Sequence, residues 1–339
     1  MDIINNKAVL LKLREPNKVT SAIPKSRELA DNKVLVNWGL EEALSLKKLN
    51  IKIPSPIEGR YKWTGRHKPF EHQKSTAAFF TMNKRSFCFN EQGTGKTASA
   101  IWASDFLMKQ GKIRRVLVVC PLSIMDSAWR DDLFTFATHR TVSVAYGPAE
   151  KRKKIIQEGS DYVIINYDGV AIVADEIKKG GFDLIIVDEA THYKNAQTTR
   201  WKTLNKLLTD DTWLWMMTGT PAAQSPVDAY GLAKMVNKNL VPRFFGSFKD
   251  QVMSRVSQFR WVIKPAATEI VFNSLQPAIR FTKEECLDLP PMVYVKREVE
   301  LTNQQKKYYA QIKNKMVMEV TGAEVTAMNA AVSLSKLLQ

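Results

Sequence analysis

A glycine-rich turn that ends in Lys-Thr constrains this chain more than any other feature. An apolar strand pattern, Phe87–Phe89, leads straight into the letters NEQGTGKT at residues 90–97. The glycines allow positive φ angles that turn backbone N–H groups inward, and the helix that follows adds its positive N-terminal end. The pattern predicts a phosphate cradle in which Lys96 reaches the β- and γ-phosphates of a nucleotide and the Thr97 hydroxyl binds Mg²⁺. The full pattern has a glycine where this chain has Asn90, and such a turn can also be an ordinary loop.

A second motif supplies the carboxylates that a nucleotide site needs. Residues 182–189 read FDLIIVDE, a buried-strand pattern with Asp188 and Glu189 at its C-terminal end. Ligands of open α/β sheets bind at that edge. We expect Asp188 to hold Mg²⁺, directly or through water, and Glu189 to polarise the water that attacks the γ-phosphate. The alternative is a strand followed by a solvated acidic turn.

Composition predicts an intracellular protein with two domains. The chain has 339 residues, of which 45% are hydrophobic, and this is enough for two cores. No apolar run approaches the roughly 20 residues of a membrane span, and the start Met1–Asn6 lacks the regions of a signal peptide. We therefore expect a cytoplasmic location.

The cysteines and histidines do not have the spacing of a metal site. The three cysteines are Cys88, Cys120 and Cys286, and the first two stand in apolar runs typical of reduced core residues. The four histidines show no ligand spacing with them. The sequence predicts no zinc site.

The charge balance favours a polyanionic partner. Fifty Lys and Arg against 34 Asp and Glu give a formal net charge of +16. Nucleic acid is the first candidate partner, although the basic residues could also be spread over a solvated surface. The basic run 151–154 precedes two isoleucines and favours the exposed face of a helix.

Apolar β-type runs alternate with helical patterns from about residue 70 to residue 235. This order predicts an α/β fold with a parallel sheet covered by helices on both faces, as in a RecA-like P-loop lobe. We expect a helix over 97–109 that Gly111 ends. Further strands are expected at 116–120, 142–145, 162–165 and 213–217.

Five further short stretches follow one another along the chain in an order that matches a known set of motifs. They are residues 69–73, 120–123 with Trp129, 165–168, 218–225, and 279–281 with 289–291 and 301–308. With the two motifs above they resemble the Swi/Snf-type ATPases of helicase superfamily two, DNA-stimulated motors built from two RecA-like lobes. Lys194-Asn195 favours this branch, whereas Thr191 stands where the family usually has histidine. Residues 61–66 are similar to phage-borne members of the family, and a phage-encoded chain would lie in the host cytoplasm.

The resemblance implies ATP and Mg²⁺ as cofactors and assigns roles to further residues. Gln73 would contact the adenine edge, and Lys96, Asp188 and Glu189 would be catalytic. The remaining nucleotide-binding residues would be Gly93, Thr94, Gly95 and Thr97, with Thr97 and Asp188 on the metal. Further residues would either line the surface along which DNA lies, here called the DNA track, or couple the two lobes. They are Ser123, Asn166, Lys194, Asn195, Thr218, Gly219 and Thr220.

The resemblance implies a nucleoside-triphosphate hydrolase, an ATP-dependent DNA translocase or helicase that remodels duplex or branched DNA. An RNA-directed helicase of the same superfamily is one alternative. A nucleic-acid-binding module that uses ATP as a switch, without productive hydrolysis, is another. The remaining motifs of the second lobe and its arginine finger, which contributes about 10³ to 10⁵ in related enzymes, are not in these residues. We expect the isolated chain to hydrolyse ATP weakly.

The motifs also divide the chain into expected domains. They are an N-terminal accessory domain at 1–65, the ATP-binding lobe at 66–275, and a connector with the start of the second lobe at 276–339. In the accessory domain we expect a strand at 34–38 and a helix at 40–49. The basic and aromatic residues of 60–66 would either grip DNA or pack against the lobe with their cations in solvent.

Overall fold

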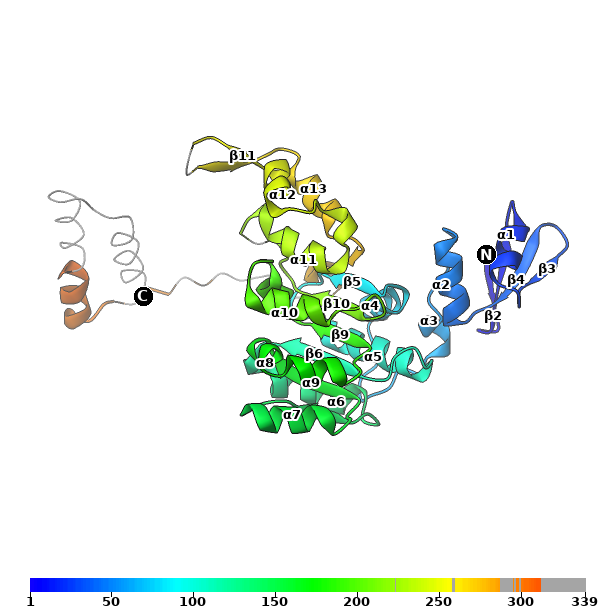
Figure 1. Ribbon diagram of the computed structural model, residues 1–339, viewed down its shortest axis with the longest axis horizontal. Helices are drawn as coiled ribbons and strands as arrows, with labels where there is room; N and C mark the ends of the chain where they lie inside the picture. Colours follow the sequence, from blue (N-terminus) through cyan, green and yellow to red (C-terminus); the bar gives the residue numbers. More distant parts are fainter. Residues whose placement is uncertain (223, 258–259, 287–294, 296, 299, 312–339) are drawn as a thin grey trace. The chain divides into compact units, whose positions relative to one another are not determined.

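The structure, a computed structural model, describes residues 1–222, 224–257, 260–286, 295, 297–298 and 300–311. The chain divides into two units, Met1–Leu289 and Pro290–Gln339. The larger unit contains a parallel sheet with its helices and a smaller antiparallel sheet formed by the N-terminal residues (Figure 1).

A seven-stranded parallel sheet forms the centre of the larger unit. In spatial order its strands are β13 (Ala278–Ile279), β5 (Arg85–Cys88), β10 (Trp213–Met217), β9 (Leu184–Val187), β6 (Val116–Cys120), β8 (Tyr162–Asn166) and β7 (Val142–Val144). Strands such as β6 (VLVVC) and β10 (WLWMM) are buried along their whole length. Continuous apolar runs of this kind form strands that are covered on both faces.

Alternate residues of each strand belong to two separate cores, one on each face of the sheet. Val116 and Val118 pack in one core with α4 (Glu71–Met82) and α5 (Lys96–Lys109). Leu117 and Val119 pack in the other core with helices of the opposite face. Those helices include α7 (Ala149–Gln157), α8 (Tyr167–Ile172), α9 (Ala174–Lys179), α10 (Thr199–Leu207) and α11 (Ala229–Val236). The α/β fold with helices on both faces is confirmed.

Short elements complete the described part of this unit. After β6 the chain forms a 3₁₀ turn, Leu122–Ile124, the π-helix Met125–Arg130 and α6 (Asp131–Phe136). Further 3₁₀ turns lie at Ala190–Tyr193, Pro226–Asp228 and Lys238–Leu240. Between α11 and β13 lie α12 (Phe245–Val252), the hairpin β11 (Met253–Arg255) and β12 (Trp261–Ile263), and α13 (Ala267–Ser274). The helix α14 (Lys283–Cys286) follows β13.

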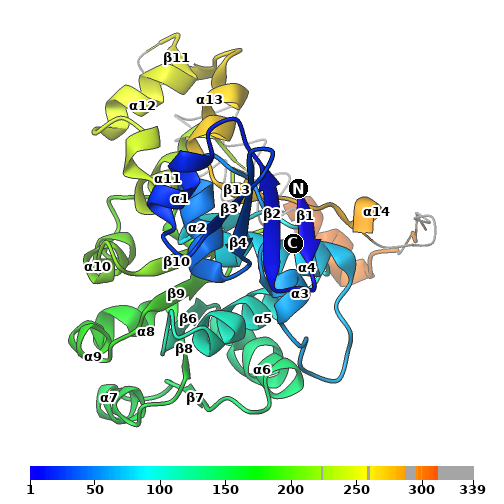
Figure 2. The ribbon, with the colours of Figure 1, turned by 90° about the vertical axis from the view of Figure 1, so that its right-hand side faces the viewer.

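The N-terminal residues form a four-stranded antiparallel sheet in the order β1-β2-β4-β3 (Figure 2). The strands are β1 (Asp2–Ile4), β2 (Ala8–Lys12), β3 (Arg27–Leu29) and β4 (Lys33–Asn37), and α1 (Pro16–Ala22) crosses between β2 and β3. Val19 of α1 and Trp38 belong to the small core of this sheet. The expected strand and helix of this region correspond to β4 and α2 (Leu40–Lys48). A short helix, α3 (Ile57–Arg60), follows.

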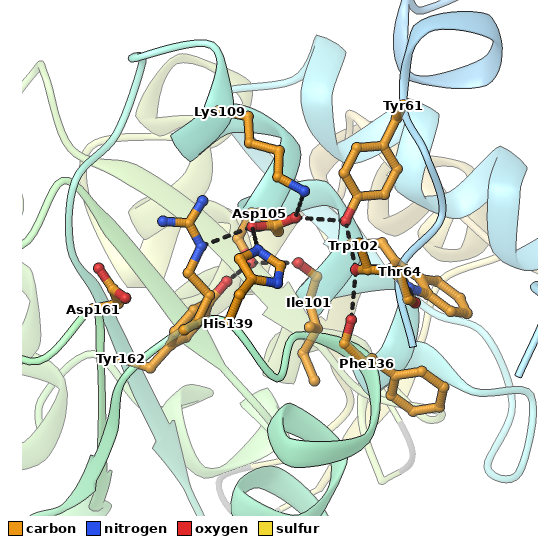
Figure 3. Close-up of polar contacts among 12 residues, drawn as sticks. Tyr61, Thr64, Ile101, Trp102, Asp105, Lys109, Phe136, His139, Asp161 and Tyr162 are labelled. Carbon is orange, nitrogen blue, oxygen red and sulfur yellow. Dashed lines mark hydrogen bonds and ion pairs between the residues drawn. The ribbon is translucent and has the colours of Figure 1, made fainter. Parts of the chain in front are cut away.

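Asp105, in the middle of α5, connects the end of the N-terminal region to the helices that cover the parallel sheet (Figure 3). Its buried carboxylate accepts hydrogen bonds from Tyr61 (2.7 Å), Arg140 (2.7 Å) and His139 (2.8 Å), and it pairs with Lys109 at 2.8 Å. Burial would raise the pKa of Asp105, but the hydrogen bonds from these four side chains outweigh it and hold the pKa below its ordinary value.

The aromatic residues before the lobe pack and do not form an open platform for bases. Tyr61 is buried and meets Trp63 edge-on at 5.3 Å, and Trp63 meets Trp102 of α5 at 5.6 Å. Gly65 has a φ of +108°, and a Cβ there would lie 2.7 Å from the Thr135 carbonyl oxygen. Of the two alternatives for residues 60–66, packing against the lobe holds for the aromatics.

The expected domain boundaries stay predictions. The pairing of β13 with β5 places the last strand of the parallel sheet beyond residue 275. In the second unit residues 303–311 are helical, and a reciprocal cap begins this helix, with Gln305 N–H donating to Thr302 Oγ1 and Thr302 N–H to Gln305 Oε1. The connector residues 289–291 lie outside the described residues.

All three cysteines are free, and the two expected in the core lie there. Cys88 and Cys120 are buried, and Cys286 is half-buried. Burial raises the pKa of the Cys88 thiol to about 12. Among the residues that the structure describes, no group of three or more His, Cys, Asp or Glu could hold a metal ion, and no helix is long and apolar enough to cross a membrane.

Candidate nucleotide-binding site

The residues Asn90–Thr97, here called the phosphate loop, connect β5 to α5. Gly93 and Gly95 have φ angles of +85° and +79°, which a residue with a side chain rarely adopts. The Lys96 ammonium donates to the carbonyl oxygens of Asn90 (2.9 Å) and Glu91 (3.2 Å). Lys96 and Thr97 are the first two residues of α5. The loop therefore has the geometry of an anion cradle at a helix N-terminus.

Two side chains of α4 hold the phosphate loop at Thr94. The buried His72 has its Nε2 2.8 Å from the Thr94 carbonyl oxygen, and Gln73 Nε2 donates to the same oxygen at 3.2 Å. Gln73 Oε1 also accepts from the Phe70 N–H at 3.0 Å. Gln73 therefore lies beside the loop, and its contact with adenine stays a prediction. Sequence reasoning missed the role of His72.

Asn90 has a structural role that the sequence did not indicate. Its side chain is 1% exposed and bridges two segments. Asn90 Nδ2 donates to Thr76 Oγ1 at 2.9 Å, and the N–H of Phe281 donates to Asn90 Oδ1 at 3.0 Å. The departure from the glycine of the full motif is thus a buried polar link between α4, the phosphate loop and the segment after β13.

A pocket of about 660 Å³ lies beside the phosphate loop and is here called the Phe281 pocket. It is lined by Phe70, Glu71, His72, Ser75, Arg280, Phe281, Glu285 and Cys286. The rings of Phe70 and His72 are parallel to within 8°, with centroids 5.8 Å apart. Flat aromatic walls with a few polar groups are typical of a site for a planar ligand.

Asp188 is buried and held by two donors. It is 7% exposed, and Trp129 Nε1 donates to its Oδ2 at 2.9 Å while the N–H of Glu189 donates to its Oδ1 at 3.0 Å. Burial raises the pKa of Asp188, and these hydrogen bonds act against the rise. Each carboxylate oxygen keeps a second lone pair, so the donor set fits Mg²⁺ bound directly or through water.

Glu189 has a backbone conformation that is uncommon for a residue with a side chain. Its φ is +46°, in the left-handed region, and strain of this kind clusters at functional sites. Thr218 Oγ1 donates to Glu189 Oε2 at 3.3 Å, and the Tyr167 hydroxyl donates to the carbonyl oxygen of Asp188 at 2.7 Å. Together these contacts place the Glu189 carboxylate beside the residues that follow β10.

Strand order brings the main site residues to one edge. β5, β10 and β9 are neighbours, so the phosphate loop, Thr218 and the Asp188-Glu189 pair follow adjacent strands at their C-terminal ends. Burial raises the pKa of Asp188, and the positive charge of Lys96 acts against this rise, as expected of two groups at the same site. A Cβ at Gly219 would meet the Asn90 carbonyl oxygen at 3.8 Å, so this glycine also lies against the loop. Thr220 donates its N–H to Thr218 Oγ1.

Lys194 links the second motif to the third. Its ammonium donates to Gln224 Oε1 at 2.7 Å and to Asp228 Oδ2 at 3.0 Å. Asn195 Oδ1 accepts from the Gln197 N–H at 2.9 Å, which forms a local turn. Whether Lys194 and Asn195 contact DNA stays a prediction.

The other expected track residues lie at the ends of β6 and β8. Ser123 is exposed in the 3₁₀ turn after β6. Asn166 Oδ1 accepts from Arg152 Nη1 at 2.9 Å. Arg152 is 5% exposed and also donates to the carbonyl oxygens of Ala145 and Gly147, so the expectation of a solvated face is wrong for this member of the basic run. The spacing of the apolar residues in α7 does not predict that Arg152 is buried.

The substitution at the fourth position of the second motif leaves His192 at the surface. Thr191 is half-buried in the 3₁₀ turn, whereas His192 is exposed with its ring centroid 4.6 Å from that of Tyr167. His192 therefore contacts the tyrosine that binds the Asp188 carbonyl.

Comparisons with known proteins agree with this geometry. The chain is 25% identical over 279 residues to protein p41 of Acyrthosiphon pisum secondary endosymbiont phage 1, covering 76% of this chain and 59% of that protein. It is 25% identical over 258 residues to an uncharacterized ATP-dependent helicase of Mycoplasma genitalium, covering 74% and 23%. With mouse chromodomain-helicase-DNA-binding protein 1-like, it is 27% identical over 235 residues, covering 66% and 25%. The chain thus spans less than two thirds of each relative.

Solved structures share the fold. The Sulfolobus solfataricus SWI2/SNF2 ATPase core in complex with dsDNA matches with a TM-score of 0.58 and 24% identity, over 81% of this chain and 58% of that one. The same core domain solved on its own matches with a TM-score of 0.55 and 23% identity, over 81% and 57%. The family profile of the SNF2-related domain matches residues 72–339. The chain belongs to the SNF2-related family, whose relatives include ATP-dependent helicases and translocases.

Proposed function

We propose that this chain binds Mg²⁺·ATP and supplies the nucleotide-binding lobe of an ATP-dependent translocase that moves along duplex or branched DNA. The observation that carries the proposal is the convergence of Lys96, Asp188, Glu189 and Thr218 at one edge of the sheet. Phosphoryl transfer needs a cradle, a cation site and a water-positioning carboxylate, and these residues would provide all three.

Each residue of the site has a defined part in the proposed hydrolysis. Lys96 would leave the loop carbonyls and bind the β- and γ-phosphates. Thr97 and Asp188 would hold Mg²⁺, which neutralises charge on the phosphate oxygens. Glu189 would accept a proton from the attacking water as the bond to the ADP leaving group breaks. Thr218, bonded to Glu189, would sense the change at the γ-phosphate.

Adenine is proposed to enter the Phe281 pocket. His72 lines this pocket and its Nε2 also lies 2.8 Å from the Thr94 carbonyl oxygen, so one residue contacts both the pocket and the phosphate loop. Phe70 and Phe281 offer aromatic surface to a base, and Gln73 stands between Phe70 and Thr94. A base held there would have its phosphates at the loop.

DNA as the partner is supported by charge and by the fold. The net charge of +16 suits a polyanion, and the archaeal core of the same fold was solved in complex with dsDNA. The chain spans 58% of that core, and we propose that these residues alone hydrolyse ATP weakly. The missing contribution would be the arginine finger of a second lobe, a factor of about 10³ to 10⁵ in related enzymes.

Single-turnover ATP hydrolysis tests the proposal, with protein in excess and with duplex DNA, forked DNA or RNA added. We expect slow hydrolysis that DNA stimulates more than RNA does. Glu189→Gln should reduce hydrolysis at least about 100-fold and leave ADP binding intact, because it removes only the proton acceptor. Glu158→Gln, at an exposed carboxylate directly after α7, is the matched control.

Three results would change the proposal. Stimulation by RNA alone would assign an RNA-directed helicase. Tight DNA binding without stimulated hydrolysis, unaffected by Glu189→Gln, would assign a binding module with ATP as a switch. Fast DNA-stimulated turnover by the 339 residues would show that hydrolysis needs no second lobe.

A further inference from the structure

The segment after β13, residues 280–283, forms several hydrogen bonds with the phosphate loop. The backbone pairing of β13 with β5 ends where Phe89 N–H donates to the Ile279 carbonyl oxygen at 2.8 Å. Beyond this point Glu91 N–H donates to the Phe281 carbonyl oxygen at 3.0 Å, and Lys283 N–H donates to Glu91 Oε2 at 3.1 Å. The segment therefore follows the loop after regular strand pairing has ended.

Asn90 supplies the one side-chain amide in this contact among the described residues. Its Oδ1 accepts the Phe281 N–H, and its Nδ2 donates to Thr76 Oγ1. Thr76 in turn donates to the His72 carbonyl oxygen at 2.7 Å. Because Asn90 is almost fully buried, loss of its side chain would leave the Phe281 N–H without this partner and would remove the donor to Thr76 Oγ1.

These hydrogen bonds connect residues that line the Phe281 pocket. Phe281 is one aromatic wall of the pocket, and its ring centroid lies 6.0 Å from that of His72, which also lines it. Asn90 is hydrogen-bonded to the Phe281 backbone directly and to the His72 backbone through Thr76. The position of the Phe281 wall therefore depends on a residue of the phosphate loop that does not line the pocket.

We propose that Asn90 is a positioning residue that sets the base-binding wall, so that it determines the preference for a whole nucleotide over its phosphate groups. The inference rests on the proposed function, because it takes the Phe281 pocket as the base site. A glycine at position 90 would complete the general phosphate-binding pattern. Here a glycine would weaken nucleotide binding, because it removes both hydrogen bonds of the Asn90 side chain that hold the Phe281 wall.

The test compares the dissociation constants of ADP and of pyrophosphate, which share the phosphates but not the base. In Asn90→Gly we expect the ratio of the pyrophosphate constant to the ADP constant to fall roughly tenfold, which corresponds to the loss of one or two buried hydrogen bonds. Thr76→Val removes the hydroxyl to which Asn90 Nδ2 donates and keeps the side-chain shape, so its ratio should also fall, but by less, because the bond to the Phe281 N–H stays. Phe281→Ala should show the same fall as Asn90→Gly.

Asn83→Gly is the matched control. Asn83 is also a buried asparagine with a side-chain bond to α4, its Nδ2 donating to the Phe79 carbonyl oxygen at 2.7 Å, but it lies at the end of α4 away from the pocket. This variant should lose stability without a change in the ratio. If Asn90→Gly does not fold, Phe281→Ala and Thr76→Val still decide, since both must lower the ratio.

The possible failures are distinguishable. An unchanged ratio in Asn90→Gly or Phe281→Ala, in protein that binds both ligands, would overturn this inference and leave the proposed function standing. An equal loss of ADP and pyrophosphate binding would assign Asn90 to the loop alone, which also overturns it. A wild-type protein that binds neither ligand would contradict the proposed function itself.

Discussion

The indole Nε1 of Trp129 donates a hydrogen bond to Oδ2 of Asp188 across 2.9 Å, in a buried position. Trp129 lies in the π-helix after β6, and Asp188 follows the neighbouring strand β9. Trp129 therefore orients the carboxylate that is expected to hold the metal. The sequence indicates this tryptophan only as part of the motif at 120–123. Partners of this kind fix the ligand and tune its affinity for the metal.

Trp129→Phe should weaken Mg²⁺-dependent nucleotide binding. The change removes the indole donor and keeps most of the aromatic packing, so the Asp188 carboxylate loses one of the two hydrogen bonds that orient it. We expect the Mg²⁺ concentration for half-maximal ADP binding to rise roughly tenfold. A titration of Mg²⁺ at constant fluorescent ADP measures it.

Trp215→Phe is the control for this change. Trp215 is equally buried and its Nε1 donates to the Asn83 carbonyl oxygen at 3.1 Å, away from the carboxylates. Both variants should lose about 1 kcal/mol of unfolding free energy, and only Trp129→Phe should change the Mg²⁺ requirement. Equal Mg²⁺ requirements in the two variants would disprove the orienting role.

Gly95→Ala should weaken ADP binding by displacing Gln73. A Cβ at Gly95 would overlap Gln73 Nε2, so the amide must leave Thr94 and Phe70. Gly111→Ala is the matched control, because Gly111 has a φ of +67° and a Cβ there would meet no atom beyond its chain neighbours within 4 Å. Both variants carry the strain of a positive φ, about 1 kcal/mol, whereas only Gly95→Ala should change the ADP affinity. Equal ADP affinities would contradict the role of Gln73.

Asp105→Asn should destabilise the protein at neutral pH. The carboxylate is fully buried and pairs with Lys109 and Arg140, so its loss leaves cations without a partner. Removing one partner of a buried pair costs about 3 to 5 kcal/mol. Urea unfolding at pH 7 measures this cost, with the exposed Asp211→Asn as a control that should change the unfolding free energy by less than about 0.5 kcal/mol.

The cost of Asp105→Asn should also depend on pH. The pKa of Asp105 lies below its ordinary value of 3.8 in the folded protein, so its stabilising effect is present above that value and is lost as the pH falls through the lowered pKa. The difference between wild type and variant should therefore be constant from pH 7 to pH 5 and shrink below about pH 4. A difference that grows on acidification would show that burial dominates and that the pKa is raised.

Lys194→Ala should reduce the stimulation of hydrolysis by duplex DNA and leave the basal rate unchanged. The ammonium joins the second motif to Gln224 and Asp228, and its loss frees the segment after β10. Asp228→Asn should act in the same way, and the double variant should be no worse than either single one, because both remove one interaction. Lys202→Ala, at an exposed lysine of α10, should have no effect. Additive losses would mean that the two residues act separately.

Local patterns predicted the parts of the site that lie within one strand and the turn after it. The phosphate loop, the pair Asp188-Glu189 and Thr218 each follow an apolar strand, and parallel pairing alone brings such strand ends together. The sequence could not predict Asn90 bonded to Phe281, 191 residues away, because nothing local marks that contact. Buried Arg152 and the short strand β13 were missed for the same reason, since their surroundings come from distant segments.

Equilibrium binding of fluorescent ADP to the 339-residue protein, with and without Mg²⁺, tests the central claim that the phosphate loop and Asp188 form a nucleotide site. We predict Mg²⁺-dependent binding that ATP displaces. Lys96→Ala should weaken it by roughly tenfold or more, since a hydrogen bond to a charged group is lost, while Lys178→Ala on the exposed face of α9 should not. Absence of binding, or binding that Lys96→Ala leaves unchanged, would contradict the account.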